Sequence, residues 1–557
     1  MDNRILTNGQ KIPPTNNNNV EPISRQPVSG SESRSHKRSF VQRAPAVAVA
    51  VGILLSRIVG LIRDRVFAHY FGNSDAADAF RAAFRIPNFL QNLFGEGVLS
   101  ASFIPVYARL NAEGRHEEAS EVAEAIFALL FLTTSVLVAV GMIATPWLID
   151  VIAPGFSGEK RLLTIRLVRI LFPGAGLLVF SAWCLGILNS HRKFLLSYTA
   201  PVIWNLTIIA TFFWEGGRQT ESELAATVAL GSVVGSALQF AVQLPAVLRF
   251  LWPLRLHRKV GAEHVRTVVN NFFPVFVSRG VVQISGYIDS LLASFLPTGA
   301  VSALAYAQTL YLLPVSLFGM SVSAAELPAM SSALGSVEEI AATLRGRLSQ
   351  GLEQIAFFVV PSATAFVVLG NVVVATIYRS GQFKARDVTY VWAVLAGSAV
   401  GLLASTSGRL YSSAFYALRN TRTPLKFAVI RVLLTLGLGY LCALPLPPLL
   451  GIDRRWGVAG LTFSAGIAGW IEFVLLRHAL HKQIGAVPYS VARVSKLWLA
   501  AITGAAAAYG IKLILPIHAP ILVGICVLVP YGLIYLLLAQ AFGISTITQA
   551  IQALRRR

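Results

Sequence analysis

Apolar runs long enough to cross a lipid bilayer recur from Ala44 almost to the end of the chain, separated by short loops. Each run has about 18–30 residues, and a helix of about 20 residues spans the hydrocarbon core of a bilayer. We count about 14 such runs. They lie at residues 46–68, 80–108, 122–150, 164–188, 198–214, 224–248, 268–296, 301–332, 352–378, 388–417, 424–446, 457–477, 497–515 and 519–542. The sequence therefore predicts an all-α integral membrane protein.

The composition excludes a large soluble globule. Of the 557 residues, 55% are hydrophobic and only 13% are charged, whereas a soluble protein has about 25% charged residues. The 47 Lys and Arg residues outnumber the 26 Asp and Glu residues. In so hydrophobic a chain, this excess favours an anionic membrane leaflet as the acidic surface that the protein faces, rather than nucleic acid.

Lys and Arg residues are distributed unevenly between the two sets of loops. One set, together with the two termini, carries about 28 of them and the other set about 8. Positively charged loops stay in the cytoplasm, so both termini are predicted to be cytoplasmic, as an even number of spans requires. Residues 1–43 contain basic residues, Pro13-Pro14 and several Asn, without the apolar core of a signal peptide. They are predicted to form a disordered basic tail.

Short motifs recur about 223 residues apart, an interval that holds six spans. Ser56-Arg57 recurs as Ser278-Arg279, Leu93-Phe94-Gly95 as Leu317-Phe318-Gly319, and Pro201 as Pro424. Such a repeat predicts two parallel six-helix lobes around a central cavity. The predicted boundaries are 44–250 for the first lobe, 251–267 for a cytoplasmic linker and 268–481 for the second lobe. Residues 482–557 hold two additional spans and a basic C-terminus.

Polar residues inside the predicted spans mark a candidate site, because a charge near the bilayer centre costs at least about 2.5 kcal/mol. At helical spacing they fall on one face of spans 1, 2 and 7, with single additions in spans 8 and 11. The main ones are Ser56, Arg57, Arg63, Asp64, Asp78, Arg85, Asn88, Glu96, Arg279, Gln283, Asp289, Glu326 and Arg431. These faces predict a hydrated cavity rich in guanidinium groups, which bind phosphate in a bidentate manner.

Different roles are predicted for the charged residues of the first lobe. Arg57, Arg63 and Arg85 are interpreted as ligands of a phosphate-bearing substrate, with internal pairing as the alternative. Asp64 and Asp78 lie near the outer end of their spans, where a structural or gating ion pair is favoured over substrate contact. We expect Asp78 to pair with an arginine when the outer side is closed.

The second lobe and Glu96 leave the alternatives open. For Glu96, substrate contact and a structural role are equally favoured. Asp289 and Glu326 are candidates for binding a coupling cation or proton. The alternative is that Asp289 pairs with Arg279 and Glu326 with Arg431.

Signatures of enzymes and metal sites are absent from the sequence. It has no GxxxxGK[ST] phosphate loop and no acidic cluster at an interfacial loop. Cys184, Cys442 and Cys526 lie apart in apolar runs, which argues against a disulfide framework and a zinc site. We expect no catalysis, no cofactor and no metal.

The stretch from Ser56 to Ala108, SRIVGLIRDRVFAHYFGNSDAADAFRAAFRIPNFLQNLFGEGVLSASFIPVYA, closely resembles the MurJ (MviN) family of lipid II flippases. Further matches are APGF at residues 153–156, the run around residues 283–297 and Thr423-Pro424. This family belongs to the multidrug/oligosaccharidyl-lipid/polysaccharide exporter superfamily. The resemblance implies two lobes around a V-shaped cavity and two C-terminal helices that form a groove for a polyprenyl tail.

The resemblance also implies the activity. The expected substrate is undecaprenyl-diphosphate-linked disaccharide-pentapeptide, moved from the cytoplasmic to the outer leaflet of the bacterial cytoplasmic membrane for peptidoglycan synthesis. Membrane lipids and proteins of cell-wall synthesis are the expected partners. Two other functions stay open: export of another polyprenyl-linked glycan or of a drug by the same fold, and a membrane scaffold without transport.

Individual positions carry the resemblance further. Six of them match residues that the family uses in its cavity or outer gate: Ser56, Arg57, Arg63, Asp78, Asn88 and Glu96. Gln91 and Thr309 stand where members of the family have arginine. We keep Gln91 among the predicted substrate-binding residues, and we expect Arg279 and Arg431 to supply the missing positive charge.

Overall fold

The computed structural model describes residues 32–94, 99, 102–251, 265–270, 272, 287–517 and 519–544. Within these ranges the regular elements are all helical. Ten of the described helices are long and apolar enough to cross a membrane, and the bent pair α15 (Ala385–Val400) and α16 (Leu402–Ala417) brings the number to eleven. The other three predicted spans fall on two highly charged helices, α1 and α2, and on the incompletely described stretch before α10. The all-α membrane fold is thereby confirmed.

The first group of helices is built around α6. Its members are α1 (Glu32–Phe71), α2 (Asp75–Phe94), α4 (Ile104–Ala112), α5 (His116–Ile152), α6 (Gly158–Ser190), α7 (Phe194–Glu215) and α8 (Glu221–Leu251). α6 packs against α2, α5 and α8, while α1 packs against α7. Gly141 of α5 lets the ring of Phe172, on α6, lie close to the α5 backbone, because a Cβ atom at this position would collide with that ring.

The second group holds the rest of the chain. Its members are α10 (Ile288–Ser294), α11 (Ala300–Pro314), the π-helical turn η2 (Val315–Met320), α12 (Ser321–Ser331), α13 (Val337–Val368), α14 (Gly370–Tyr378), α15, α16, α17 (Arg422–Ala443), α18 (Leu446–Leu449), the short turn η3 (Arg454–Trp456), α19 (Gly457–Ile484), α20 (Val491–Ile514) and α21 (Pro520–Ala541). α19 packs against α15, α16 and α17. α20 and α21 form a hairpin that rests on α13 and α14, where the hydroxyl of Tyr531 donates to the carbonyl of Pro361 over 2.6 Å.

The start of α1 differs from the expectation. Residues 32–43 were predicted to belong to a disordered tail, but α1 begins at Glu32 and includes them. Residues 31–44 contain no Gly or Pro that would oppose a helix, and Pro45 stands inside α1 without ending it. Residues 1–31 of the predicted tail lie outside the described residues.

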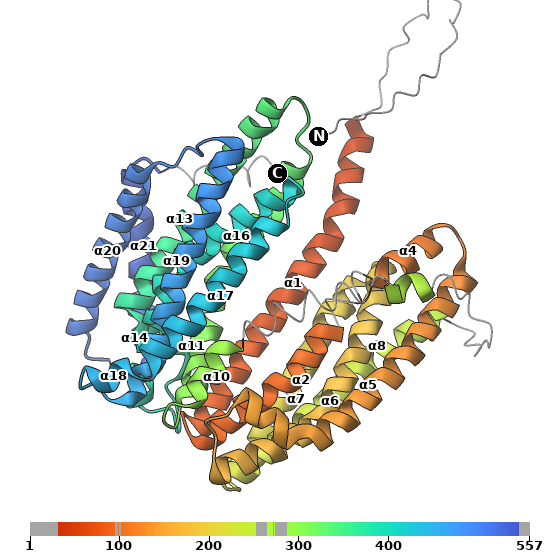
Figure 1. Cartoon of the computed structure of the whole chain (residues 1–557), viewed down its shortest axis with the longest axis horizontal. Helices are drawn as coiled ribbons and strands as arrows, with labels where there is room; N and C mark the ends of the chain where they lie inside the picture. Colours follow the sequence, from red (N-terminus) through yellow and green to blue (C-terminus); the bar gives the residue numbers. More distant parts are fainter. Residues whose placement is uncertain are drawn as a thin grey trace, which may run out of the picture.

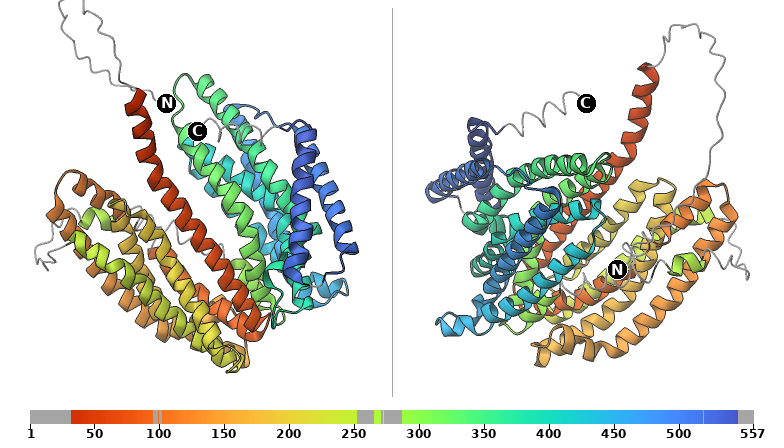
Figure 2. Two further views of the ribbon diagram at one scale, coloured as in Figure 1. Left: turned by 180° about the vertical axis from the view of Figure 1, so that it is seen from behind. Right: turned by 45° about the horizontal axis from the view of Figure 1, so that its top comes forward.

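The two groups of helices touch at one end and separate toward the other. Figures 1 and 2 show them close together where α1 ends and α2 begins, and apart where α1 starts. Between the groups, α2 packs against α11, α1 against α14 and α5 against α10. We call these groups the first and second lobe, and the exact lobe boundaries stay a prediction.

Candidate functional site

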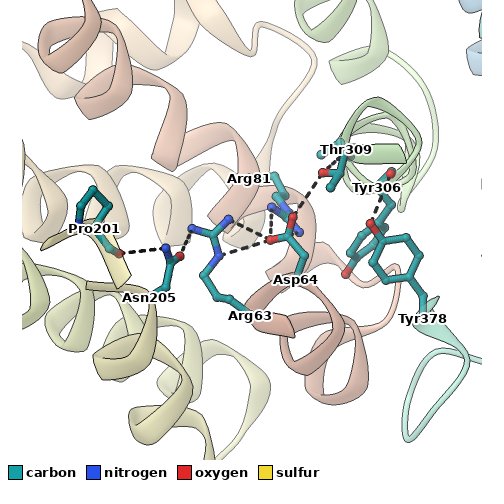
Figure 3. A network of polar contacts seen from close by, with 9 residues as sticks. Arg63, Asp64, Arg81, Pro201, Asn205, Tyr306, Thr309 and Tyr378 are labelled. Atoms are coloured by element: carbon teal, nitrogen blue, oxygen red, sulfur yellow. Dashed lines mark hydrogen bonds and ion pairs between the residues drawn. The ribbon is translucent and has the colours of Figure 1, made fainter. Parts of the chain in front are cut away.

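A buried carboxylate on α1, that of Asp64, joins three helices near the closed end of the lobes (Figure 3). Its Oδ1 atom accepts from Nη2 of Arg63 at 3.0 Å and from Nη1 of Arg81, on α2, at 3.3 Å. Its Oδ2 atom accepts from the hydroxyl of Thr309, on α11 of the second lobe, at 3.2 Å. Thr309 therefore binds the charged network as a neutral donor.

Arg63 extends this network into the first lobe. Its Nη1 atom donates to Oδ1 of Asn205, on α7, at 3.0 Å, and its guanidinium lies 5.4 Å from the ring centroid of Trp204. The amide of Asn205 donates in turn to the carbonyl of Pro201. Arg63 is thus held by internal partners on two sides, which favours a positioning role over the substrate contact that we predicted.

Aromatic rings enclose Arg81. Its guanidinium lies 4.3 Å from the ring centroid of Phe67 and 5.0 Å from that of Tyr306. The hydroxyl of Tyr306, on α11, donates to the carbonyl of Gly72 at 2.9 Å, across the lobe boundary. Cation–π contacts in a desolvated setting are worth about 2 kcal/mol, so this aromatic block both stabilises the cation and seals the end of the molecule.

Asp78 lies at the same end and binds the start of α11. Its carboxylate is 1% exposed. Backbone N–H groups of Gly299 and Ser302 donate to it at 2.8 Å and 2.7 Å, and Nζ of Lys160 lies 2.6 Å away. The first N–H groups of a helix lack intrahelical acceptors and carry positive partial charge, so an anion is stabilised there. Gly299 has φ 90°, a left-handed conformation that suits glycine.

The prediction that an arginine pairs with Asp78 is wrong. Its partners are Lys160, in the first turn of α6, and the backbone N–H groups of Gly299 and Ser302. No residue pattern could predict these partners, because Lys160 is 82 residues away and backbone donors are not visible in a residue pattern.

Further contacts between the lobes lie at this same end. Arg65 donates from Nη1 to the carbonyls of Thr376 and Ile377, at the end of α14, over 2.8 Å and 2.7 Å. The N–H of Gln382 donates to the carbonyl of His69. The N–H of Gly155 donates to the hydroxyl of Ser294. In the described residues, the lobes are thus bonded at one end of the molecule.

Of the three arginines predicted to bind substrate in the first lobe, Arg57 and Arg85 have no carboxylate partner among the described residues. Arg57 lies about two turns of α1 from Asp64, toward the open end of the lobes. It is exposed and has no hydrogen bond or ion pair with a described residue. Arg85, on α2, lies 5.7 Å from the ring centroid of Tyr287 and has no ion pair with a described carboxylate. Ser56 neighbours Arg57, and Asn88 and Gln91 follow Arg85 along α2, all three partly exposed.

Arg85 also lines an apolar cavity between the lobes. The cavity has a volume of about 620 Å³ and extends between α2, α5, α6 and α10. Its walls are hydrophobic, with Phe89, Leu148 and Leu291 among them. A guanidinium beside an apolar space suits an amphiphile with an anionic head.

The charged candidates of the second lobe are paired differently from the alternative that we considered. Arg431 lies 3.2 Å from the carboxylate of Glu472, on α19, rather than beside Glu326. Glu326 lies 3.9 Å from Arg347. Asp289 lines a cavity of about 230 Å³ together with Arg409 and Arg431, and its Oδ1 atom is buried without a hydrogen-bond partner among the described residues.

Two predicted site residues, Glu96 and Arg279, lie outside the described residues, as does Gln283. The pairing of Arg279 with Asp289 therefore stays a prediction. Asn205 was missed, although a polar residue in an apolar run four positions after Pro201 meets the criterion used for the other spans. Among the described residues, no group of His, Cys, Asp and Glu has the arrangement of a metal site.

Comparison with known proteins identifies the family. The family model described as lipid II flippase MurJ matches residues 67–531. The lipid II flippase MurJ of Burkholderia cenocepacia is 31% identical over 439 residues, which cover 77% of this chain and 82% of that protein. The probable lipid II flippase MurJ of Haemophilus influenzae is 29% identical over 82% of this chain and 89% of its own length.

Solved structures agree with this assignment. The lipid II flippase MurJ in an inward closed conformation superposes with a TM-score of 0.73 at 26% identity, covering 90% of this chain and all of that one. An inward-facing multidrug transporter of the MATE family, from the MOP superfamily, shares the fold with a TM-score of 0.60 at 16% identity, over 79% of this chain and 98% of its own. The closed polar end, the paired lobes and these matches place the chain in the lipid II flippase MurJ family.

Proposed function

We propose that the chain translocates lipid II, the undecaprenyl-diphosphate-linked disaccharide-pentapeptide, across the bacterial cytoplasmic membrane by alternating access. The observation that carries this proposal is the asymmetry of the lobe contacts. Asp64, Asp78 and Arg65 bond the lobes at one end, while Arg57 and Arg85 remain unpaired with described carboxylates. A transporter that alternates between two open states needs contacts of this kind, formed on one side at a time.

The charge distribution sets the proposed orientation. The loops rich in Lys and Arg lie at the end where α1 begins, which puts both termini in the cytoplasm. The lobes then diverge toward the cytoplasm and are joined on the outer side (Figure 2). This arrangement presents the cavity to the leaflet in which the substrate is made.

Each residue has a proposed task. The guanidinium groups of Arg57 and Arg85 bind the diphosphate as it leaves the headgroup region, because burial of an unpaired anion in an apolar setting is costly. Ser56, Asn88 and Gln91 offer hydrogen bonds beside them. Arg63 holds Asp64 in place. Release of the substrate on the outer side requires Asp78 to leave the N–H groups of Gly299 and Ser302.

Translocation by purified protein in vesicles, together with complementation of a strain depleted of its own lipid II flippase, tests this proposal. We expect Arg57→Ala to abolish both activities at normal membrane abundance, and Arg57→Lys to restore only part of them, since an ammonium lacks the bidentate fork. The matched control is Arg218→Ala, an exposed arginine in the loop between α7 and α8.

The results also separate the proposal from its alternatives. Transport of another polyprenyl-linked glycan in place of lipid II would overturn the substrate assignment. Full activity of Arg57→Ala would overturn the role of the free guanidinium while leaving the fold untouched.

A further inference from the structure

A second ligand-sized space lies outside the path between the lobes. A cavity of about 330 Å³ opens between α14, α15 and the hairpin of α20 and α21. Its lining residues come from α14 and the residue after it, the start of α15, the end of α20 and the start of α21. With the orientation proposed above, this is the level of the headgroups of the outer leaflet.

Two cations from distant parts of the sequence line this cavity. Arg379 follows the last residue of α14, and Lys512 lies in the last turn of α20. Neither has an ion pair or a side-chain hydrogen bond with a described residue, and Nζ of Lys512 lies 5.2 Å from the ring centroid of Tyr509. No Asp or Glu is among the described residues that line the cavity.

Two other cations at this end of the molecule have carboxylate partners. Lys160 lies 2.9 Å from Asp75 and 2.6 Å from Asp78, and Arg161 lies 2.8 Å from Asp150. Arg379 and Lys512 therefore form a local positive charge without an internal counterion. Lys and Arg held beside a low-dielectric wall attract an anion more strongly than they would in free solvent.

The remaining walls define the rest of the ligand. Val372, Val388, Leu515 and Val523 make one side apolar. Asn371 adds a carboxamide whose Oδ1 atom is buried without a hydrogen-bond partner among the described residues. Rotation of this carboxamide by half a turn presents its two N–H donors in place of its oxygen, so Asn371 can serve a ligand as acceptor or as donor.

We propose that this cavity binds the phosphodiester of an anionic glycerophospholipid of the outer leaflet. Arg379 and Lys512 contact the phosphate, Asn371 hydrogen-bonds a polar atom of the headgroup, and an acyl chain follows the apolar wall along the hairpin. Inorganic phosphate would leave that wall unused. The diphosphate of the transported lipid shares the same chemistry, but the cavity lies behind α14, away from the lobe boundary that Arg57 and Arg85 face. The proposal rests on the membrane orientation proposed above and does not depend on the transport of lipid II.

Native mass spectrometry of the full-length protein tests this site. The probes are phosphatidylglycerol, phosphatidylcholine, inorganic phosphate and undecaprenyl phosphate, each added to delipidated protein. Arg379→Ala with Lys512→Ala removes both charges, and Ala385→Trp fills the cavity from an exposed rim position without any change of charge. The control pair is Arg218→Ala with Arg454→Ala, two exposed arginines of the outer loops that lie outside the cavity.

We expect the wild type and the control pair to retain phosphatidylglycerol. Loss of both cavity cations should weaken its binding by about thirtyfold, on the basis of about 1 kcal/mol for each basic residue near a membrane surface. Ala385→Trp should weaken it as well. The proposal would be overturned if the control pair lost phosphatidylglycerol as much as the cavity variants do. It would also be overturned if the wild type retained phosphatidylcholine as well as phosphatidylglycerol, or bound inorganic phosphate alone. Stronger retention of undecaprenyl phosphate at this site would overturn the choice of ligand.

Discussion

At the scale of single residues, Asp78 shows how a charge is kept where it is almost fully buried. Two backbone N–H groups and an ammonium group surround its carboxylate. Charge-assisted hydrogen bonds of this kind are about twice as strong as neutral ones. The burial of Asp78 is therefore tied to the closed arrangement of the lobes, since two of its three donors belong to the second lobe.

Neutralising this charge should loosen the closed end. Asp78→Asn keeps the size of the side chain but loses the attraction to Lys160 and to the start of α11. We expect a cysteine introduced at Ala303, which is fully buried on α11, to react several-fold faster with a polar maleimide in this variant. Glu159→Gln is the control, because it removes an exposed carboxylate beside Lys160, in the first turn of α6. Unchanged labelling in Asp78→Asn would show that Asp78 does not hold the gate.

A histidine at the opposite end makes stability depend on pH. His191 follows α6, lies 3.0 Å from the hydroxyl of Tyr107 and stacks on the ring of Phe250. Burial, with a smaller contribution from nearby His116, lowers the pKa of His191. The unfolded chain takes up a proton at pH about 6.5, before the folded protein does. The stability that the neutral ring contributes is present above that pH and is lost as the pH falls through the lower pKa of the folded protein.

Thermal unfolding between about pH 7.5 and pH 5.5 measures this effect. We expect the melting temperature of the wild type to fall more on acidification than that of His191→Phe, which keeps the stack on Phe250 without a titratable ring. Parallel pH profiles for the two proteins would refute this interpretation.

At the scale of helices, Arg65 caps α14 from the other lobe. The last carbonyls of a helix lack intrahelical donors, and Arg65 supplies N–H groups to those of Thr376 and Ile377. The hydroxyl of Thr376 also donates to the carbonyl of Pro520, at the start of α21. The end of α14 thus links α1, on one side, to the C-terminal hairpin on the other.

Removal of this cap should favour the outward-open state. We expect Arg65→Ala to raise labelling of the same Ala303→Cys reporter while the melting temperature changes little, and Arg65→Lys to have a smaller effect. Arg166→Ala, at an exposed arginine of α6, is the control. A fall in melting temperature without added labelling would mean that Arg65 stabilises the fold and takes no part in the gate.

The helices were predictable to different degrees. Long apolar runs predicted most spans correctly, because a helix needs about 20 predominantly apolar residues to cross the hydrocarbon core. The break between α15 and α16 and the π-helical turn η2 were not predicted, since they arise from packing rather than composition. The polar faces of α1 and α2 include Arg63, Asp64 and Asp78, whose contacts the structure describes, while their roles stay predictions. Their partners, such as Lys160 for Asp78 and Glu472 for Arg431, depend on proximity that a helical period does not encode.

At the scale of the whole molecule, the lobes are joined at one end and apart at the other (Figure 1). If transport requires that end to open, a covalent bond across it should stop the cycle. Ser302 and Asn73 suit this purpose, because the Oγ atom of Ser302 lies 3.1 Å from Oδ1 of Asn73 on the first lobe.

We expect Asn73→Cys with Ser302→Cys to form a disulfide under oxidation and to lose translocation of lipid II in vesicles. A reducing agent should restore it. Each single variant, treated with the same oxidant, should stay active. Transport by the fully cross-linked protein would exclude opening at this end as a step of the cycle.

The bonds across the closed end have a consequence for sequence divergence. On the second lobe, the partners of Asp78, Arg65 and His69 are main-chain groups of Gly299, Ser302, Thr376, Ile377 and Gln382. Main-chain amides and carbonyls exist whatever side chain is attached, provided that the backbone keeps its course. At these main-chain positions mutational drift is thus tolerated, apart from the left-handed Gly299, whereas Thr309 and Tyr306 bond across the closed end through their side chains. Homologues that have lost most of their sequence identity can retain the same seal.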